Sequence, residues 1–125
     1  MPDVAAETSQ RRTDTPIRRL NTFAQERDWD QFHSPKNLSM ALMVEAGELM
    51  EHFQWLTQEQ SQKLAPDKLA EVEHELADIL IYLTRLAAKL NVDLFAAARN
   101  KMDLNEKKYP AETVRGSAKK YTEYE

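Results

Sequence analysis

The stretch "HELADILIYL", residues 74–83, places one carboxylate, that of Asp78, inside a run of large apolar side chains. A second stretch, "MALMVEAGELM" (40–50), repeats the pattern with Glu45 and Glu48. Both stretches are apolar on nearly every face of a helix, and such a helix must be enclosed by protein on all sides. The sequence therefore predicts two buried helices that carry acidic groups within them.

Helical periodicity continues on both sides of these stretches and predicts four helices. They span residues 17–28, 35–55, 67–90 and 94–109. Thr15-Pro16 and Ser34-Pro35 each supply a capping residue followed by a proline suited to the first helical turn, and Pro110 stops the last helix. No convincing strand is present in the sequence. The predicted fold is all-α, a four-helix bundle.

The remaining segments are polar. We expect residues 1–14 to form a disordered tail, residues 15–110 the helical domain, and residues 111–125 a polar C-terminal tail. Residues 57–66 read as a polar connection that can hold one short helical turn. A single layer of four helices would leave one side of the two most apolar helices exposed to solvent. We therefore expect them to meet another subunit, so that the protein is a homo-oligomer.

Composition excludes several classes of protein. The 125 residues are enough for one domain, and two glycines are too few for the turns of an all-β fold. The absence of cysteine excludes disulfides and thiolate chemistry, which fits a cytoplasmic location. The apolar runs are shorter than the roughly 20 residues of a membrane span, so no membrane association is expected. The net charge of −4 argues against binding of a nucleic acid polymer, but not against a single nucleotide held through metal ions.

The acidic residues of the apolar helices form two pairs. Glu45 and Glu48 are three residues apart, as are Glu75 and Asp78, so each pair projects from one helix face. A buried ionised carboxylate without a partner costs several kcal/mol, so it must pair with a cation, bind metal or become protonated. No lysine or arginine lies between residues 36 and 63. Carboxylate-only ligands suit hard cations, and we predict a Mg²⁺ site in which Mn²⁺ can substitute.

Other interpretations of these residues remain open. Glycine inside a helix costs roughly 1 kcal/mol, so Gly47 is expected where something approaches the backbone closely. A solvated acidic stripe is the better interpretation for other glutamates of the same helices, namely Glu51, Glu71 and Glu73. A di-iron bundle is disfavoured because it needs two Glu-x-x-His motifs, and only Glu71 to His74 provides one on a helix.

Five blocks of sequence, in this order and at these separations, resemble the MazG-like all-α nucleotide pyrophosphohydrolases. They are "ERDWDQFHSPKNL" (26–38), "EAGELMEHFQW" (45–55), "ELADILIYL" (75–83), "NKMDLNEKKYP" (100–110) and "AKKYTEY" (118–124). The resemblance covers about residues 17–124 and is greatest to the dCTP pyrophosphatase branch. The E-x-x-E and E-x-x-D motifs mark the superfamily, whereas the RDW, QFH and FQW blocks are more specific to the branch.

The resemblance implies hydrolysis of a nucleoside triphosphate, dCTP or a modified dCTP, between the α and β phosphates. It implies that the metal ligands are Glu45, Glu48, Glu75 and Asp78. It implies a nucleoside pocket and phosphate contacts formed by Trp29, Asp30, Gln31, Phe32, His33, Trp55, Tyr82, Lys101 and Asn105. We expect Glu48 to act as general base, although the residues alone do not decide between Glu48 and the other carboxylates for that role. Relatives assemble as dimers or tetramers with pockets near subunit boundaries, and we expect a tetramer here.

Two alternatives accompany this interpretation. The first helix reads "RRLNTF", with Asn21 where the branch can carry a histidine, and shifted base contacts would suit a housecleaning enzyme of broad specificity. The non-enzymatic alternative is a helical oligomerisation module whose acidic residues neutralise a partner. It is the weaker of the two because the chain lacks a basic patch at heptad e and g positions.

Overall fold

The computed structural model describes residues 16–118 and residue 122, and within these ranges the regular elements are helices. The helices are α2 (Pro16–Glu26), the 3-10 turn η1 (Asp30–Phe32), α3 (Pro35–Glu51), α4 (Gln58–Ser61), α5 (Pro66–Lys89), α6 (Leu94–Lys108) and α7 (Ala111–Val114). No strand occurs among the residues described. The predicted all-α class is confirmed.

Side-chain caps fix where α3, α4 and α6 begin. The Ser34 hydroxyl accepts a hydrogen bond from the backbone N–H of Asn37 at 3.2 Å, and proline follows at the first position of α3. Thr57 and Gln60 form a capping box that starts α4, the short turn expected in the connection. The Asp93 carboxylate accepts from the N–H of Ala96 at 3.0 Å and starts α6.

One predicted helix end is wrong. The sequence extends the second helix to Trp55, but α3 ends at Glu51. Beyond it the backbone tightens into turns, in which the N–H of His52 donates to Leu49 at 3.2 Å and that of Phe53 to Met50 at 2.9 Å. Such bonds to the third residue back close a helix end, so Trp55 lies on a turn rather than on the helix.

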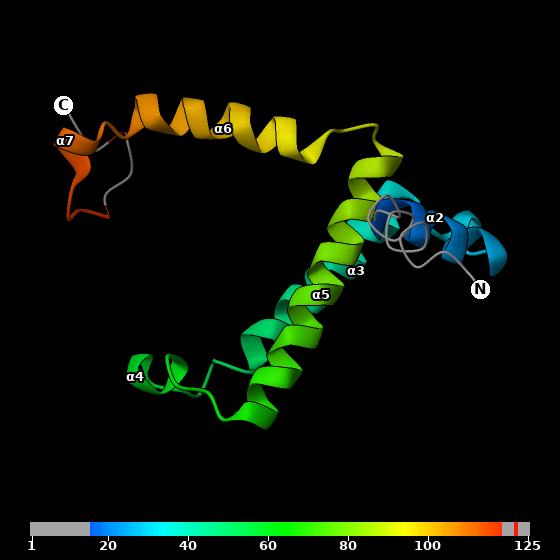
Figure 1. Cartoon of the computed structure of the whole chain (residues 1–125), viewed down its shortest axis with the longest axis horizontal. Coiled ribbons are helices and arrows are strands. Elements are labelled where there is room, and N and C mark those ends of the chain that lie inside the picture. The colour runs from blue at the N-terminus through cyan, green and yellow to red at the C-terminus, as the bar shows by residue number, and fades with distance from the viewer. Residues whose placement is uncertain (1–15, 119–121, 123–125) are drawn as a thin grey trace, which may run out of the picture. The chain divides into compact units, whose positions relative to one another are not determined.

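The chain separates into two compact units, residues 1–91 and residues 92–125. In the first unit α3 and α5 lie side by side and antiparallel, and α2 packs against α5 near the end of that helix (Figure 1). Asn91, with a left-handed φ of 55°, ends α5, a conformation that asparagine tolerates. The second unit contains α6 and α7. The four-helix bundle and the domain limits at residues 15 and 110 therefore stay predictions.

The core of the first unit is small. Ala24, Leu38, Val72 and Ala87 are buried, with Leu38 only 1% exposed. Many larger apolar side chains of α3 and α5 remain exposed within one chain. This agrees with the expectation that further protein covers these helices.

Some predictions lie outside the described residues. The disordered tail at 1–14 and the Thr15 cap fall there, as do residues 119–121 and 123–125 of the C-terminal segment. Part of that segment, residues 111–114, forms the short helix α7. In the described part of the chain, no helix combines the length and apolarity that a membrane span requires.

Candidate functional site

Three carboxylates converge where α3 packs against α5. Glu45 and Glu48 come from α3 and Glu75 from α5, and one oxygen of each lies within 4.8 Å of the others. The spacing of three residues puts the two α3 carboxylates on the face that meets α5. Glu45 and Glu75 are half-buried, whereas Glu48 is exposed. We refer to these three residues as the acidic cluster.

The acidic cluster lacks internal compensation for its charge. One oxygen each of Glu45 and Glu75, the Oε2 atom, is buried without a hydrogen-bond partner. Burial raises the pKa of Glu45 to about 7, helped by hydrogen bonds with Glu75 and Glu48 and by the charges of Glu48 and Asp78. Buried, unpaired oxygens from several carboxylates are the donor set that a divalent cation stabilises. The cluster can therefore hold a metal ion.

Asp78, the fourth predicted ligand, lies beside the acidic cluster rather than within it. Its charge contributes to the raised pKa of Glu45, and its side chain lines the cavity next to the cluster. Asp78 thus joins the acidic cluster to the cavity.

His52 also borders the acidic cluster, a neighbour that the sequence argument did not assign. Its Nε2 atom lies 3.8 Å from an oxygen of Glu75, and its Nδ1 atom lies 3.7 Å from one of Glu71. The signal in the sequence was its position four residues after Glu48, which places both on one helix face.

The cavity has a volume of about 570 Å³ and is formed by α2, the segment after it and α5. Its lining residues are Arg19, Leu20, Phe23, Ala24, Trp29, His33, Asp78, Ile81, Tyr82 and Arg85. Aromatic rings shape one wall, since Trp29 meets Phe23 edge-on at 5.4 Å between centroids and His33 at 6.2 Å. An apolar cavity with a few polar groups at its edge suits a small organic ligand.

A buried arginine joins the cavity wall to the segment that carries Trp29. Arg85 of α5 is 6% exposed and donates to Asn21 at 2.5 Å, to His33 Nδ1 at 3.4 Å, and to Asp30. Lys89 also donates to Asp30, at 3.3 Å. Segments 52 to 64 residues apart in the chain are thereby connected.

These contacts set the charges of Asp30 and His33. Burial acts to raise the pKa of Asp30, but hydrogen bonds from Lys89 and Arg85 and the charges of both hold that pKa below its usual value. Burial lowers the pKa of His33, and the charge of Arg85 lowers it further against the opposing charge of Asp30. Asp30 is therefore a paired anion, and His33 favours its neutral form.

The predicted substrate residues are only partly brought together. Three of them, Trp29, His33 and Tyr82, line the cavity, together with the predicted metal ligand Asp78. Gln31 donates to the backbone and to the carboxylate of Asp28, each at 3.0 Å, so it supports the local turn.

The other predicted substrate residues are not among those that line the cavity. Phe32 is 61% exposed and Trp55 is 86% exposed within one chain. Lys101 and Asn105 belong to α6, in the second unit.

The sequence argument missed most of the remaining cavity wall. Phe23 and Leu20 belong to the apolar face predicted for the first helix, which signals burial but does not distinguish a core from a cavity. Arg85 is a lone cation within an apolar helix, but its partners lie too far along the chain to be identified from spacing.

Comparison with known proteins gives concordant results. A MazG-like family model matches residues 40–124. The chain is 52% identical over 110 residues to dCTP pyrophosphatase 1 of Homo sapiens and 53% identical to that of Bos taurus. These matches cover 86% of this chain and 65% of each relative, so the chain spans about two-thirds of the length of the curated relatives.

A solved structure is also similar. The crystal structure of a pyrophosphatase from Archaeoglobus fulgidus aligns with a TM-score of 0.70 and 38% sequence identity. The alignment covers 73% of this chain and 85% of that chain.

Proposed function

The chain belongs to the MazG-like family, and from that premise we propose that it is a Mg²⁺-dependent nucleoside triphosphate pyrophosphatase that hydrolyses dCTP to dCMP and pyrophosphate. The names of its relatives, dCTP pyrophosphatase 1, support the substrate and the reaction. The observation that carries the proposal is an acidic cluster with unpaired buried oxygens next to an aromatic-walled cavity. A nucleotide has the matching parts, a phosphate chain that needs cations and a flat base.

The acidic cluster and Asp78 are the proposed metal ligands, with Mn²⁺ as a possible substitute for Mg²⁺. Four carboxylates alone would repel a triphosphate, so the site needs a cation to bind it. Bound there, the metal would offset charge on the phosphate oxygens and favour in-line attack of water at the α-phosphorus. Glu48 is the exposed member of the cluster, and we propose it as the base that takes a proton from that water.

The cavity residues are proposed to bind the nucleoside. The Trp29 ring offers a stacking face, and stacking of a base on an aromatic side chain contributes about 1–3 kcal/mol. Tyr82 and Asp78 line the same cavity, and Asp78 also acts on the charge of Glu45, so base and phosphates would bind side by side. Trp55, Lys101 and Asn105 remain proposed substrate contacts on the strength of the family resemblance alone.

A broad-specificity (d)NTP pyrophosphohydrolase is the second candidate. It is favoured by the state of Asp30, whose carboxylate accepts hydrogen bonds from Arg85 and Lys89. A carboxylate whose oxygen already accepts hydrogen bonds from the protein is not available to recognise the edge of a base. Stacking alone does not discriminate between bases.

The decisive experiment incubates the purified protein with each dNTP and NTP in the presence of Mg²⁺. Monophosphate and pyrophosphate are the expected products, with dCTP consumed fastest. Diphosphate with orthophosphate would refute the predicted bond, and equal rates on all nucleotides would select the second candidate. No turnover of any nucleotide would favour the non-enzymatic helical module.

Conservative variants test the acidic residues. Glu45→Gln and Asp78→Asn should each lower kcat by about 100-fold or more, because each removes a negative oxygen donor without changing side-chain volume. Glu73→Gln is the matched control, since Glu73 is exposed on the same α5 helix, and its kcat should stay within about twofold of wild type. Retained activity in both site variants, with the fold intact by circular dichroism, would refute the assignment.

A further inference from the structure

Arg85 is a charged residue that the structure buries and that the proposed reaction does not use. Its 6% exposure removes a guanidinium from water, which is costly unless every donor finds a partner. It finds three, each on a different part of the chain. Asn21 comes from α2, Asp30 from η1, and His33 from the residue after η1.

The guanidinium of Arg85 is directed at acceptors within the protein. All three of its nitrogen atoms, Nε, Nη1 and Nη2, donate to acceptors of the protein itself. A guanidinium has a planar, fixed fork of donors, so these bonds also fix its orientation. The charge is further balanced by Asp30, whose pKa lies below its ordinary value because hydrogen bonds and charges from Lys89 and Arg85 outweigh its burial. Arg85 therefore acts on the protein rather than on an anionic ligand.

The hydrogen bonds that hold the segment Trp29–His33 against α5 come from Arg85, to Asp30 and His33, and from Lys89, to Asp30 alone. Asp28, at its start, adopts a left-handed φ of 54°, and the helix there is a single 3-10 turn. Trp29 is 43% exposed, so packing alone does not fix its ring. The bonds from Arg85 to Asp30 and His33 tie both the middle and the end of this segment to the cavity wall.

We propose that Arg85 is a positioning residue for the nucleoside side of the cavity, holding Trp29 as a stacking face and His33 as a hydrogen-bond donor to the base. The inference rests on the proposed function in assigning a nucleoside to this cavity. It reassigns Asp30 from a residue of the nucleoside pocket to an anchor for the segment.

The contact with Arg85 also determines which nitrogen of the His33 ring carries the proton. Its Nδ1 atom accepts from Arg85, so in the neutral ring the proton resides on Nε2. Burial and the charges of Arg85 and Lys89 lower the pKa of His33 and favour the neutral ring, against the opposing charge of Asp30. A fixed Nε2–H suits an acceptor on the ligand, such as a carbonyl oxygen or an unprotonated ring nitrogen of the base.

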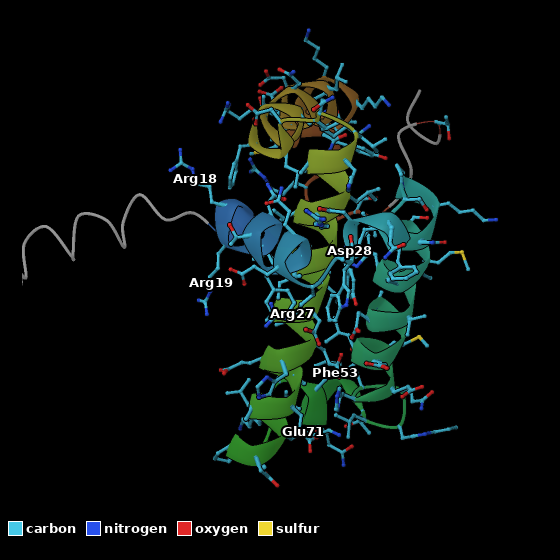
Figure 2. All side chains as sticks on the ribbon, turned by 90° about the vertical axis from the view of Figure 1, so that its right-hand side faces the viewer. Arg18, Arg19, Arg27, Asp28, Phe53 and Glu71 are labelled. Atoms are coloured by element: carbon cyan, nitrogen blue, oxygen red, sulfur yellow. The ribbon has the colours of Figure 1, made fainter. Side chains whose placement is uncertain are left out.

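The first test compares Arg85→Met and Arg85→Lys with the control Arg18→Met. Arg18 is exposed on the same unit and points away from α5 (Figure 2). Arg85→Met should raise the KM for the nucleotide by about tenfold and leave kcat within about threefold, because the acidic cluster is not altered. Arg85→Lys, which keeps the charge but loses the fork, should give an intermediate KM, and Arg18→Met should give none of these changes.

A second readout reports on the ring directly. Nitrogen-15 NMR of His33 in the ligand-free protein should show the Nε2–H tautomer in wild type and in Arg18→Met. In Arg85→Met and Arg85→Lys the ring should exchange between tautomers. Unchanged His33 signals and an unchanged KM in both Arg85 variants would overturn the proposal. A lower kcat and a lower free energy of unfolding with an unchanged KM would also overturn it, because Arg85 would then have only a structural role. Should Arg85→Met fail to fold, Arg85→Lys decides.

Asp30→Asn separates anchoring from base reading. An anchor predicts a KM that rises by a similar factor, about threefold, for all nucleotides tested. A changed order of preference among the bases would assign Asp30 to direct reading and overturn the proposed role. If wild type hydrolyses no nucleotide, the proposed function fails on its own, and the His33 signals still decide whether Arg85 fixes the segment.

Discussion

Glu45 shows at the scale of one residue how an acidic group is tolerated in an apolar helix pair. Its Oε2 atom is buried without a partner, and the nearest polar groups are other carboxylates. Burial first, and then contacts and charges of Glu75, Glu48 and Asp78, raise its pKa to about 7. Without a cation the site therefore destabilises the fold once Glu45 ionises.

This gives a prediction for the metal-free protein. The pKa of Glu45 is about 7 in the folded protein, against an ordinary value of 4.5 that we take for the unfolded chain. Between these two pH values the folded protein therefore binds more protons than the unfolded chain. The free energy of unfolding should fall as pH rises through that window. Glu45→Gln removes this term, so in EDTA the variant should be more stable than wild type near pH 8 and similar near pH 4. Urea unfolding at both pH values measures the difference.

Metal and a surface variant provide the controls for that measurement. Adding Mg²⁺ or Mn²⁺ near pH 8 should raise the stability of wild type more than that of Glu45→Gln, since a ligand stabilises the state that binds it. Glu73→Gln should behave as wild type throughout. A stability difference between Glu45→Gln and wild type that is the same at both pH values would contradict the assigned pKa.

At the scale of helices, local chemistry predicted the starts well. Ser34 caps α3 as expected, and Asp93 caps α6 in the same way, because capping depends on residues only two or three positions apart. The end of α3 was predicted less well, since His52 and Trp55 continue the helical pattern although the backbone has turned into 3-10 geometry.

The same distinction between near and distant partners applies to the candidate site. The acidic cluster was predictable because Glu45 and Glu48, like Glu75 and Asp78, lie three residues apart on helices that were expected to pack together. The hydrogen bond from Arg85 to Asn21 could not be predicted, because it joins residues 64 positions apart and depends on how α2 packs on α5. The position of His52 beside the acidic cluster could have been predicted from its spacing of four residues from Glu48, but it was not.

Gly47 gives a prediction at this scale. A Cβ atom built there meets no described neighbour within 4 Å, so within one chain the expected close approach is absent. Gly47→Ala should therefore raise the free energy of unfolding of the dissociated chain by about 1 kcal/mol, the helix propensity difference. Urea unfolding at low protein concentration measures this, and a destabilised variant would contradict the structure. If a substrate or a second subunit approaches Gly47, activity or assembly should fall despite the gain.

At the scale of the whole molecule, the first unit exposes more apolar surface than a stable monomer normally does. Met43 of α3 is 70% exposed and Leu80 of α5 is 57% exposed, and Val44, Met50 and Leu76 are exposed by half or more. Scattered exposed apolar residues are normal, but these lie on the two helices that form the packed pair. This surface is consistent with the predicted homo-oligomer, in which other copies of the chain would cover α3 and α5; the tetramer stays a prediction.

The oligomer is tested by placing a charge on that surface. Complete burial of a side chain such as methionine contributes about 1.5–3 kcal/mol, whereas an unpaired carboxylate in an interface is costly. Met43→Glu should therefore lower the mass observed by sedimentation equilibrium from that of a tetramer of 14.5 kDa chains toward that of a smaller species. Lys36→Glu, exposed at the start of the same helix, should leave the mass unchanged. A wild-type protein that sediments as a monomer at micromolar concentration would refute the predicted assembly, and the exposed face of α3 would then need another partner.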